Sequence, residues 1–157
     1  MEEFVKTVTY GKHTQISTSI FKRNVLDVGC GNSLIVYKFY PYSYVYEVDK
    51  ILGNDVLIDG LPECKWDIIF ANHVIEHLHD TDRFLEKCKK VMSSNTILDI
   101  GTPNLCAWFN RVLFLFGYLP HSYEVSYRKG YGRAFNWNDE EMGGHIRVFS
   151  VPSLVAM

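Results

Sequence analysis

Short apolar runs alternate with segments of helical spacing along most of this 157-residue chain. Several of these runs are bounded by turn-forming residues, which predicts the strands of a mostly parallel sheet. The predicted strands lie near residues 24–28, 44–48, 55–58, 66–71 and 96–101. Helices are predicted between them, near residues 33–40, 73–78 and 80–92. Regular alternation of strand and helix is typical of an α/β fold, so we predict that class.

Composition narrows the class of protein further. A chain of this length can bury one hydrophobic core but not two, so we expect a single domain spanning residues 1–157. The net charge of −2 argues against a polyanion-binding protein. No apolar stretch reaches the roughly 20 residues of a membrane-spanning helix, so no membrane association is expected. The cysteines lack metal-site spacing and no signal peptide precedes them, which favours reduced thiols in the cytoplasm.

The segment Val-Leu-Asp-Val-Gly-Cys-Gly-Asn-Ser at residues 25–33 joins the first predicted strand to the first predicted helix. Gly29 and Gly31 carry no Cβ, so the backbone there can approach a ligand closely. A strand, glycine turn and helix in this order form the nucleotide site of open α/β sheets. Asp49 follows the second strand at about the 20-residue distance expected for a carboxylate that binds ribose hydroxyls. Asp27 lies inside the turn, where it would repel a pyrophosphate and attract a cationic amino acid, which favours S-adenosylmethionine over NAD.

These residues resemble the first motif of class I S-adenosylmethionine-dependent methyltransferases, apolar-apolar-Asp-apolar-Gly-Cys-Gly. Segments that match the same family continue along the chain at residues 59–62, 66–78, 84–92, 97–104 and 143–150. The last of them resembles the methyltransferase type 11 group. The chain departs from the family pattern at two places. Ser33 is a mild departure at a position where the family usually has a small residue, and Ser93-Ser94-Asn95 replaces the family's Pro-Gly-Gly turn.

The resemblance implies a doubly wound, Rossmann-like sheet of about five strands in the order 3-2-1-4-5. The family's C-terminal antiparallel hairpin would follow Met157, so we expect a minimal or C-terminally truncated enzyme whose fifth strand needs cover. Residues 24–104 would form the cofactor-binding core. The aromatic-rich residues 105–150 would form a lid on the substrate side or cover the sheet edge, and a homodimer could serve the same purpose.

The candidate cofactor-binding residues share a position at the expected carboxyl edge of the sheet. They are Asp27, Gly29, Cys30, Gly31, Asp49, Asp59, Asn72 and His73. Asp59 occupies the place where the family has an acidic residue beside the adenine, although Asp55 competes for that role.

His73, Glu76 and His77 have the i, i+3, i+4 spacing of one helical face. The trio resembles the Glu-x-x-Glu-His metal motif of small-RNA 2′-O-methyltransferases and ubiquinone-pathway O-methyltransferases, with His145 as a fourth ligand. His73 replaces the first carboxylate of that motif, and hard cations prefer oxygen, so we predict no metal. In the simpler interpretation, Glu76 and His77 shape the pocket through local hydrogen bonds.

We therefore predict an S-adenosylmethionine-dependent methyltransferase that acts on an O or N acceptor by in-line displacement. His77 and His145 are the candidate bases, because histidine titrates near neutrality. The acceptor stays open among small molecules, glycans, proteins and RNA. The alternatives are a non-catalytic S-adenosylmethionine-binding subunit and a metal-assisted RNA 2′-O-methyltransferase. Asp27 disfavours an NAD-dependent oxidoreductase.

Overall fold

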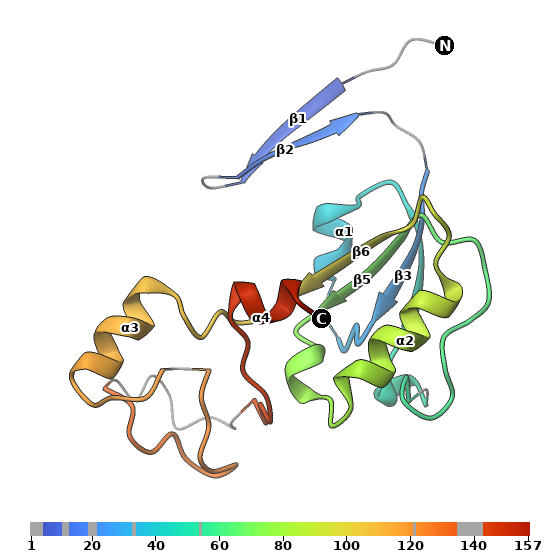
Figure 1. The fold of residues 1–157 in the computed structure, drawn as a ribbon. Coiled ribbons are helices and arrows are strands. Elements are labelled where there is room, and N and C mark those ends of the chain that lie inside the picture. Colours follow the sequence, from blue (N-terminus) through green and yellow to red (C-terminus); the bar gives the residue numbers. More distant parts are fainter. Residues whose placement is uncertain are drawn as a thin grey trace.

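The central sheet consists of four parallel strands, β3 (Asn24–Val28), β4 (Tyr44–Val48), β5 (Ile68–Asn72) and β6 (Ile97–Gly101). The computed structural model describes residues 5–10, 13–18, 22–32, 34–53, 55–120, 122–134 and 143–157. The strand order is β4-β3-β5-β6, as Figure 1 shows in part. Val25 of β3 pairs with Val45 on one side and Ile68 on the other. A separate antiparallel hairpin, β1 (Val5–Tyr10) and β2 (His13–Thr18), precedes this sheet.

Helices cover both faces of the sheet, which is why its central strands are apolar along nearly their whole length. On one face, α1 (Ile35–Phe39) places Val36 against Val25, Ile68 and Phe70. On the other, α2 (Thr81–Val91) places Phe84 and Cys88, both fully buried, in the larger core. The two helices lie on opposite sides of the strands in Figure 1. The predicted α/β, doubly wound class is confirmed.

The helix α2 begins where the sequence predicts. The Asp80 carboxylate accepts a hydrogen bond from the Arg83 backbone N–H at 2.9 Å, which satisfies one of the free amides of the first turn. The helix ends at Val91, one residue before the predicted end.

The predicted third strand near residues 55–58 is wrong, because this segment is a series of turns. The Asp55 backbone carbonyl accepts hydrogen bonds from the N–H groups of Ile58 and Asp59. The Asp59 carboxylate in turn accepts from the Asp55 N–H at 2.7 Å. Asp side chains that bond nearby amides compete with a strand ladder, so β4 forms the edge of the described sheet. The other four predicted strands keep their predicted order.

The predicted helix near residues 73–78 is shorter than expected. It consists of a single 3₁₀ turn, η2 (Ile75–His77), preceded by His73 with a positive φ of 57°. A positive φ is uncommon outside glycine and breaks the continuation from β5 into a helix. The predicted common helical face of His73, Glu76 and His77 is therefore wrong, because His73 directly follows β5 and lies outside the turn that contains the other two.

The chain after β6 contains α3 (Trp108–Leu115) and α4 (Val151–Val155). It returns to the sheet near Phe149, whose carbonyl accepts from the Leu105 N–H at 2.7 Å. In the described residues, β6 pairs along its length with β5 alone. This part of the chain therefore reaches the end of β6 without adding a strand to its edge.

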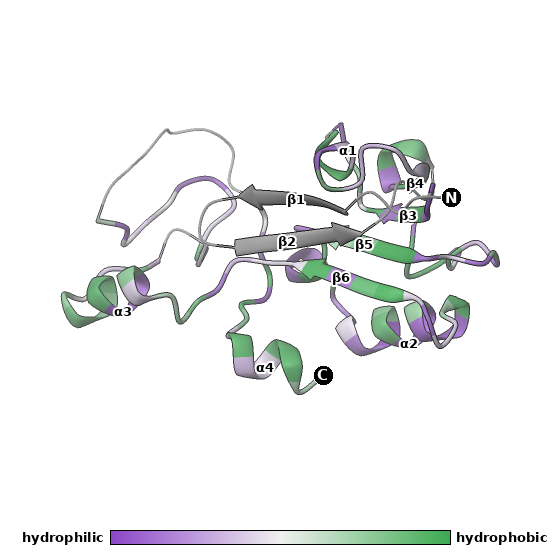
Figure 2. Cartoon of the chain, turned by 90° about the horizontal axis from the view of Figure 1, so that it is seen from above, coloured by the Kyte–Doolittle hydropathy of each residue, from purple (hydrophilic) through white to green (hydrophobic). Residues whose placement is uncertain are grey.

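The one buried residue of helix α3 is polar. Asn110 is buried and donates to the Asn104 carbonyl at 3.0 Å, whereas Trp108 is 77% and Leu115 80% exposed. Figure 2 shows α3 as a largely hydrophobic helix set apart from β5 and β6. Among the described residues, none of the helices is both long enough and apolar enough to cross a membrane.

Candidate functional site

A cavity of about 210 Å³ lies at the carboxyl ends of β3, β4 and β5. It is lined by Val28, Gly29, Val48, Asp49, Lys50, Val56, His73, Val74, His77 and Leu78. The chain leaves β3 toward β4 on one side and later enters β5 on the other, so the cavity lies at the point where the strand order reverses. Open α/β sheets bind their ligands at this point.

The glycine turn after β3 has positive φ values at both glycines, but Asp27 lies within β3 and not inside the turn as the sequence predicts. Gly29 has a φ of 71° and Gly31 a φ of 54°, a region that favours glycine. The Gly29 N–H donates to the Val48 carbonyl at 2.7 Å. A Cβ on residue 29 would lie 2.4 Å from a methyl carbon of Val74, so the turn also needs glycine for close packing.

Asp49 ties this turn to the end of β4. One carboxylate oxygen accepts from the Gly31 N–H at 2.9 Å, and the other accepts from the Ile51 N–H at 2.8 Å. The second bond caps the 3₁₀ turn η1 (Lys50–Leu52). A carboxylate has about four acceptor positions, so two remain on Asp49 for hydroxyl groups in the cavity that it lines.

Asp27 is the most deeply buried carboxylate around the glycine turn. It is 2% exposed, and its Oδ2 atom has no hydrogen-bond partner among the described residues. Burial, with repulsion from Glu47 and Asp49, raises the pKa of Asp27 to about 6. A buried carboxylate oxygen without a partner is costly, so the place of Asp27 beside the glycine turn suits a ligand that brings a cationic donor.

The remaining predicted cofactor residues lie at different distances from the cavity. Gly29, Asp49 and His73 line it, whereas Asp27, Cys30, Gly31, Asp59 and Asn72 are not among its lining residues. Asn72 packs on β6, where a Cβ on Gly101 would lie 2.0 Å from its Oδ1 atom. Cys30 is buried, and this burial with nearby carboxylates raises its pKa to about 11, so its thiol packs as a neutral group.

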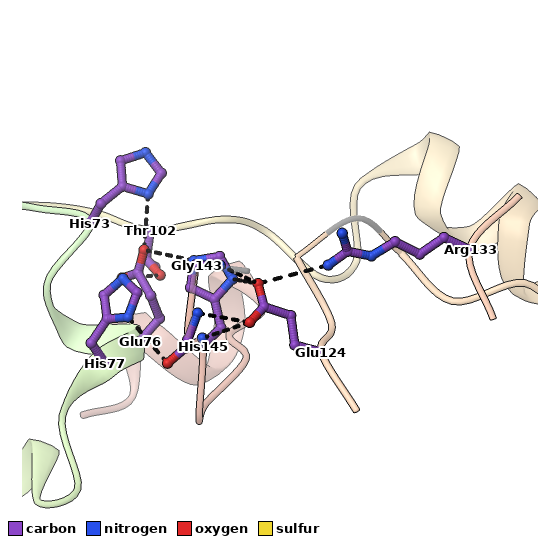
Figure 3. A network of polar contacts seen from close by, with 9 residues as sticks. His73, Glu76, His77, Thr102, Glu124, Arg133, Gly143 and His145 are labelled. Carbon is purple, nitrogen blue, oxygen red and sulfur yellow. Dashed lines mark hydrogen bonds and ion pairs between the residues drawn. The ribbon is translucent and has the colours of Figure 1, made fainter. Parts of the chain in front are cut away.

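A polar network centred on Glu76 lies next to the cavity (Figure 3). Glu76 is 1% exposed. Its Oε1 atom lies 2.9 Å from His73 Nδ1, and its Oε2 accepts from the Thr102 hydroxyl at 3.0 Å. Its backbone carbonyl accepts from the N–H groups of Ile146 and Arg147. Glu76 therefore joins the ends of β5 and β6 to the segment around His145.

The structure brings together the two predicted bases, His77 and His145. Their ring centroids lie 4.9 Å apart, and His77 Nδ1 lies 3.3 Å from the Gly144 carbonyl. The Nε2 atom of His145 lies 3.9 Å from Glu76 Oε1. Of the two rings, only that of His77 belongs to a residue lining the cavity.

Sequence reasoning missed Glu124, a buried carboxylate on the far side of His145. It accepts hydrogen bonds from three consecutive backbone amides, those of Gly143, Gly144 and His145. Its Oε1 also lies 3.4 Å from His145 Nδ1 and 3.7 Å from an Arg133 guanidinium nitrogen. The only signal in the sequence is the Gly143-Gly144 pair, which permits the positive φ of 75° at Gly144.

Glu76, His77 and His145 could also hold a metal ion, because each offers one ligand atom and these atoms lie within 4.8 Å of one another. The two Glu76 oxygens already contact His73 and Thr102, so the carboxylate has partners within the protein as well.

Comparisons with known proteins agree with the resemblance seen in the motifs. No family model matches the chain. It is 26% identical over 103 residues to the ubiquinone biosynthesis O-methyltransferase of Pelagibacter ubique (strain HTCC1062), which covers 51% of this chain and 42% of the relative. It is also 26% identical over 99 residues to a probable S-adenosylmethionine-dependent methyltransferase, MT3114, of Mycobacterium tuberculosis (strain CDC 1551 / Oshkosh), covering 52% of this chain and 36% of the relative.

The fold agrees as well. The crystal structure of the YcgJ protein from Bacillus subtilis superposes with a TM-score of 0.50 at 16% identity, covering 86% of this chain and 59% of that one. The chain thus spans about two fifths of the length of the curated relatives that it matches. These relatives are enzymes by name, and the predicted resemblance to S-adenosylmethionine-dependent methyltransferases is confirmed.

Proposed function

We propose that this chain binds S-adenosylmethionine and transfers its methyl group to an oxygen or nitrogen acceptor. The observation that carries the proposal is the buried Asp27 carboxylate, whose Oδ2 atom has no hydrogen-bond partner among the described residues, beside a glycine turn that Asp49 holds in place. A cationic amino acid group would give Asp27 Oδ2 the partner that it lacks. The ribose hydroxyls would bind the free acceptor positions of Asp49 in the cavity.

The cofactor would supply a methyl group bound to a sulfonium sulfur. The methyl group goes to the acceptor, and the rest of the cofactor leaves as a neutral thioether. Little covalent chemistry remains for the protein, whose main task is to hold the acceptor in line with the methyl carbon at about 3–3.5 Å. His77 lines the cavity and lies beside His145, so one of these imidazoles would take the proton from a hydroxyl or ammonium acceptor. Glu76 would orient His73 at the cavity wall.

Two measurements test this function. Calorimetry should detect binding of S-adenosylmethionine and its demethylated product but not of NAD. Radiolabelled methyl groups should then appear in one of five acceptor pools, namely RNA, DNA, protein, glycan and small molecules. Binding without transfer to any pool would support the non-catalytic subunit instead, and absence of binding would refute both.

The near contact of Glu76, His77 and His145 favours a second candidate, metal-assisted methylation of an RNA or a diol. A divalent cation held by these residues would lower the pKa of an acceptor hydroxyl. Methyl transfer would then stop with a chelator and return with added metal. Transfer that resists the chelator would leave the metal-free reaction, which remains our first choice.

The proposal also includes an acceptor among small molecules, glycans, proteins and RNA. It further includes a homodimer and a cytoplasmic location. All four cysteines are free, which suits a reducing compartment. The β6 edge and the exposed apolar side chains of α3 offer surfaces for a second copy. Light scattering over a range of protein concentrations tests the dimer, and a constant monomer mass would contradict it.

A further inference from the structure

We propose that Glu124 is a positioning residue that holds His145 in its place beside Glu76 and His77. This inference rests on the proposed function, because the task of His145 is defined by that function. Glu124 itself has no contact with the cavity and would act only through His145.

Glu124 makes several hydrogen bonds to one short stretch of backbone. Three successive backbone amides, from Gly143 to His145, converge on one carboxylate, at 3.1, 2.8 and 3.2 Å. Consecutive N–H groups that turn inward around a left-handed residue form an anion-binding concavity, and Gly144 supplies the left-handed residue. Glu124 fills that concavity from within the chain, so the backbone at His145 has one defined path.

Glu124 also contacts the imidazole of His145. Its Oε1 lies 3.4 Å from His145 Nδ1, while His145 Nε2 faces Glu76 Oε1 at 3.9 Å. The ring is therefore held between two buried carboxylates, on opposite nitrogens (Figure 3). His145 Nδ1 makes no hydrogen bond among the described residues, so its contact with Glu124 is electrostatic and adds to the three amide hydrogen bonds that fix the backbone at His145.

Glu124 is itself buried and has a cationic neighbour. Its side chain is 6% exposed and lies against Arg133, whose side chain is 10% exposed. Its loop is closed by the hydrogen bond from the Leu119 N–H to the Gly132 carbonyl at 2.8 Å. Because the Glu124 carboxylate has a fixed position of its own, it can restrict the position of His145, whereas a mobile, exposed carboxylate could not.

The main experiment compares Glu124→Ala with Glu86→Ala, a control at an exposed position of α2. We expect Glu124→Ala to lower kcat about 10²-fold and to change the S-adenosylmethionine Kd by less than about 2-fold, because a small displacement of a reacting group has that cost and the cavity is untouched. The control should behave as the wild type. A wild-type kcat in Glu124→Ala, or a parallel loss of kcat and cofactor affinity, would refute the positioning role.

A double-mutant cycle separates this role from general support of the fold. If Glu124 acts through His145, Glu124→Ala combined with His145→Ala should be no slower than His145→Ala alone. Additive losses would overturn the proposal. Should Glu124→Ala not fold, Glu124→Gln keeps the shape and one acceptor oxygen, and the same cycle applies to it.

Amide hydrogen exchange makes the test independent of methyl transfer. Exchange at residues 143–147 should accelerate in Glu124→Ala, while that of α2 stays unchanged. Unchanged exchange at 143–147 would refute the inference even in an active enzyme. If the wild type transfers no methyl group, the proposed function fails, and the exchange experiment still decides whether Glu124 holds His145.

Discussion

Two parts of the chain that follow the β1–β2 hairpin, the described residues of 24–104 and of 105–157, are each stabilised by different kinds of contact. The first is built around two apolar clusters on either side of a parallel sheet. In the second, Phe149 and Pro120 are buried, but polar contacts made by Glu124 and by the Glu76 carbonyl join its segments, and large apolar side chains of α3 are exposed. Because every lining residue of the cavity belongs to the first part, we expect cofactor affinity to depend on that part, whereas substitutions around His145 should affect mainly the catalytic rate.

The largest effect is expected from Gly29→Ala in the first part. The new Cβ would overlap Val74 in a backbone of positive φ, which should abolish cofactor binding and lower the free energy of unfolding by about 2–4 kcal/mol. Calorimetry and denaturant unfolding measure the two losses. In the control Gly29→Ala/Val74→Ala the clash is removed and only the backbone strain remains, so part of the stability should return. Wild-type affinity in the single variant would show that the turn is not part of the site.

The next effect concerns Asp27. Its raised pKa of about 6 means that the fold favours the protonated carboxyl, so this stabilising contribution is present below pH 3.8 and is lost as the pH rises through about 6. Asp27→Asn should therefore stabilise the free protein at pH 7–8 by up to about 3 kcal/mol. Denaturant unfolding measures this change.

The same substitution should weaken S-adenosylmethionine binding at neutral pH, because the cationic group loses its carboxylate. The affinity of the wild type should fall below about pH 6, where Asp27 becomes protonated, and that of Asp27→Asn should be flatter with pH. Calorimetry at several pH values tests this, and parallel profiles for both proteins would exclude Asp27 from the site.

A somewhat smaller effect is expected from Asp49→Ala. Loss of hydrogen bonds to a charged group should weaken cofactor affinity by about 1.5–3 kcal/mol. Asp49→Asn, which keeps one acceptor oxygen, should lose less. Equal affinity in Asp49→Ala and the wild type would remove Asp49 from the ribose site.

The smallest effect is expected in the second part of the chain. Trp108→Ala and Leu115→Ala should each change the free energy of unfolding by no more than about 0.5 kcal/mol, because both side chains are mostly exposed. Thermal unfolding at low protein concentration is the measurement. A loss of several kcal/mol would show that these side chains are covered, and dependence of that loss on concentration would identify a second copy as the cover.

Local patterns in the sequence predicted most of the first part. The strands at 24–28 and 44–48 have the predicted limits, because apolar runs between turn residues leave little choice of boundary. The run at 55–58 is similarly apolar, but Asp55 and Asp59 bond the neighbouring amides and hold it in turns. A competition between side-chain and ladder hydrogen bonds of this kind is invisible to hydrophobic periodicity.

The second part was predictable only where a resemblance pointed to it. The resemblance suggested that His145 could approach His77, and the rings do lie together. Nothing suggested Glu124, whose partners lie 19 to 21 residues further along the chain with no periodic pattern between them. Contacts of this kind depend on how loops close in space.

The carboxylates around the glycine turn have a consequence for turnover. Burial raises the pKa of Asp27 most, and repulsion from Glu47 and Asp49 adds to it, so three carboxylates give the region of the turn a negative potential above about pH 6. Under the proposed function, the methyl donor enters with a positive sulfonium and leaves as a neutral thioether. Such a potential holds the spent product less firmly than the fresh donor, so the turn that attracts the cofactor would also favour its exchange after each reaction.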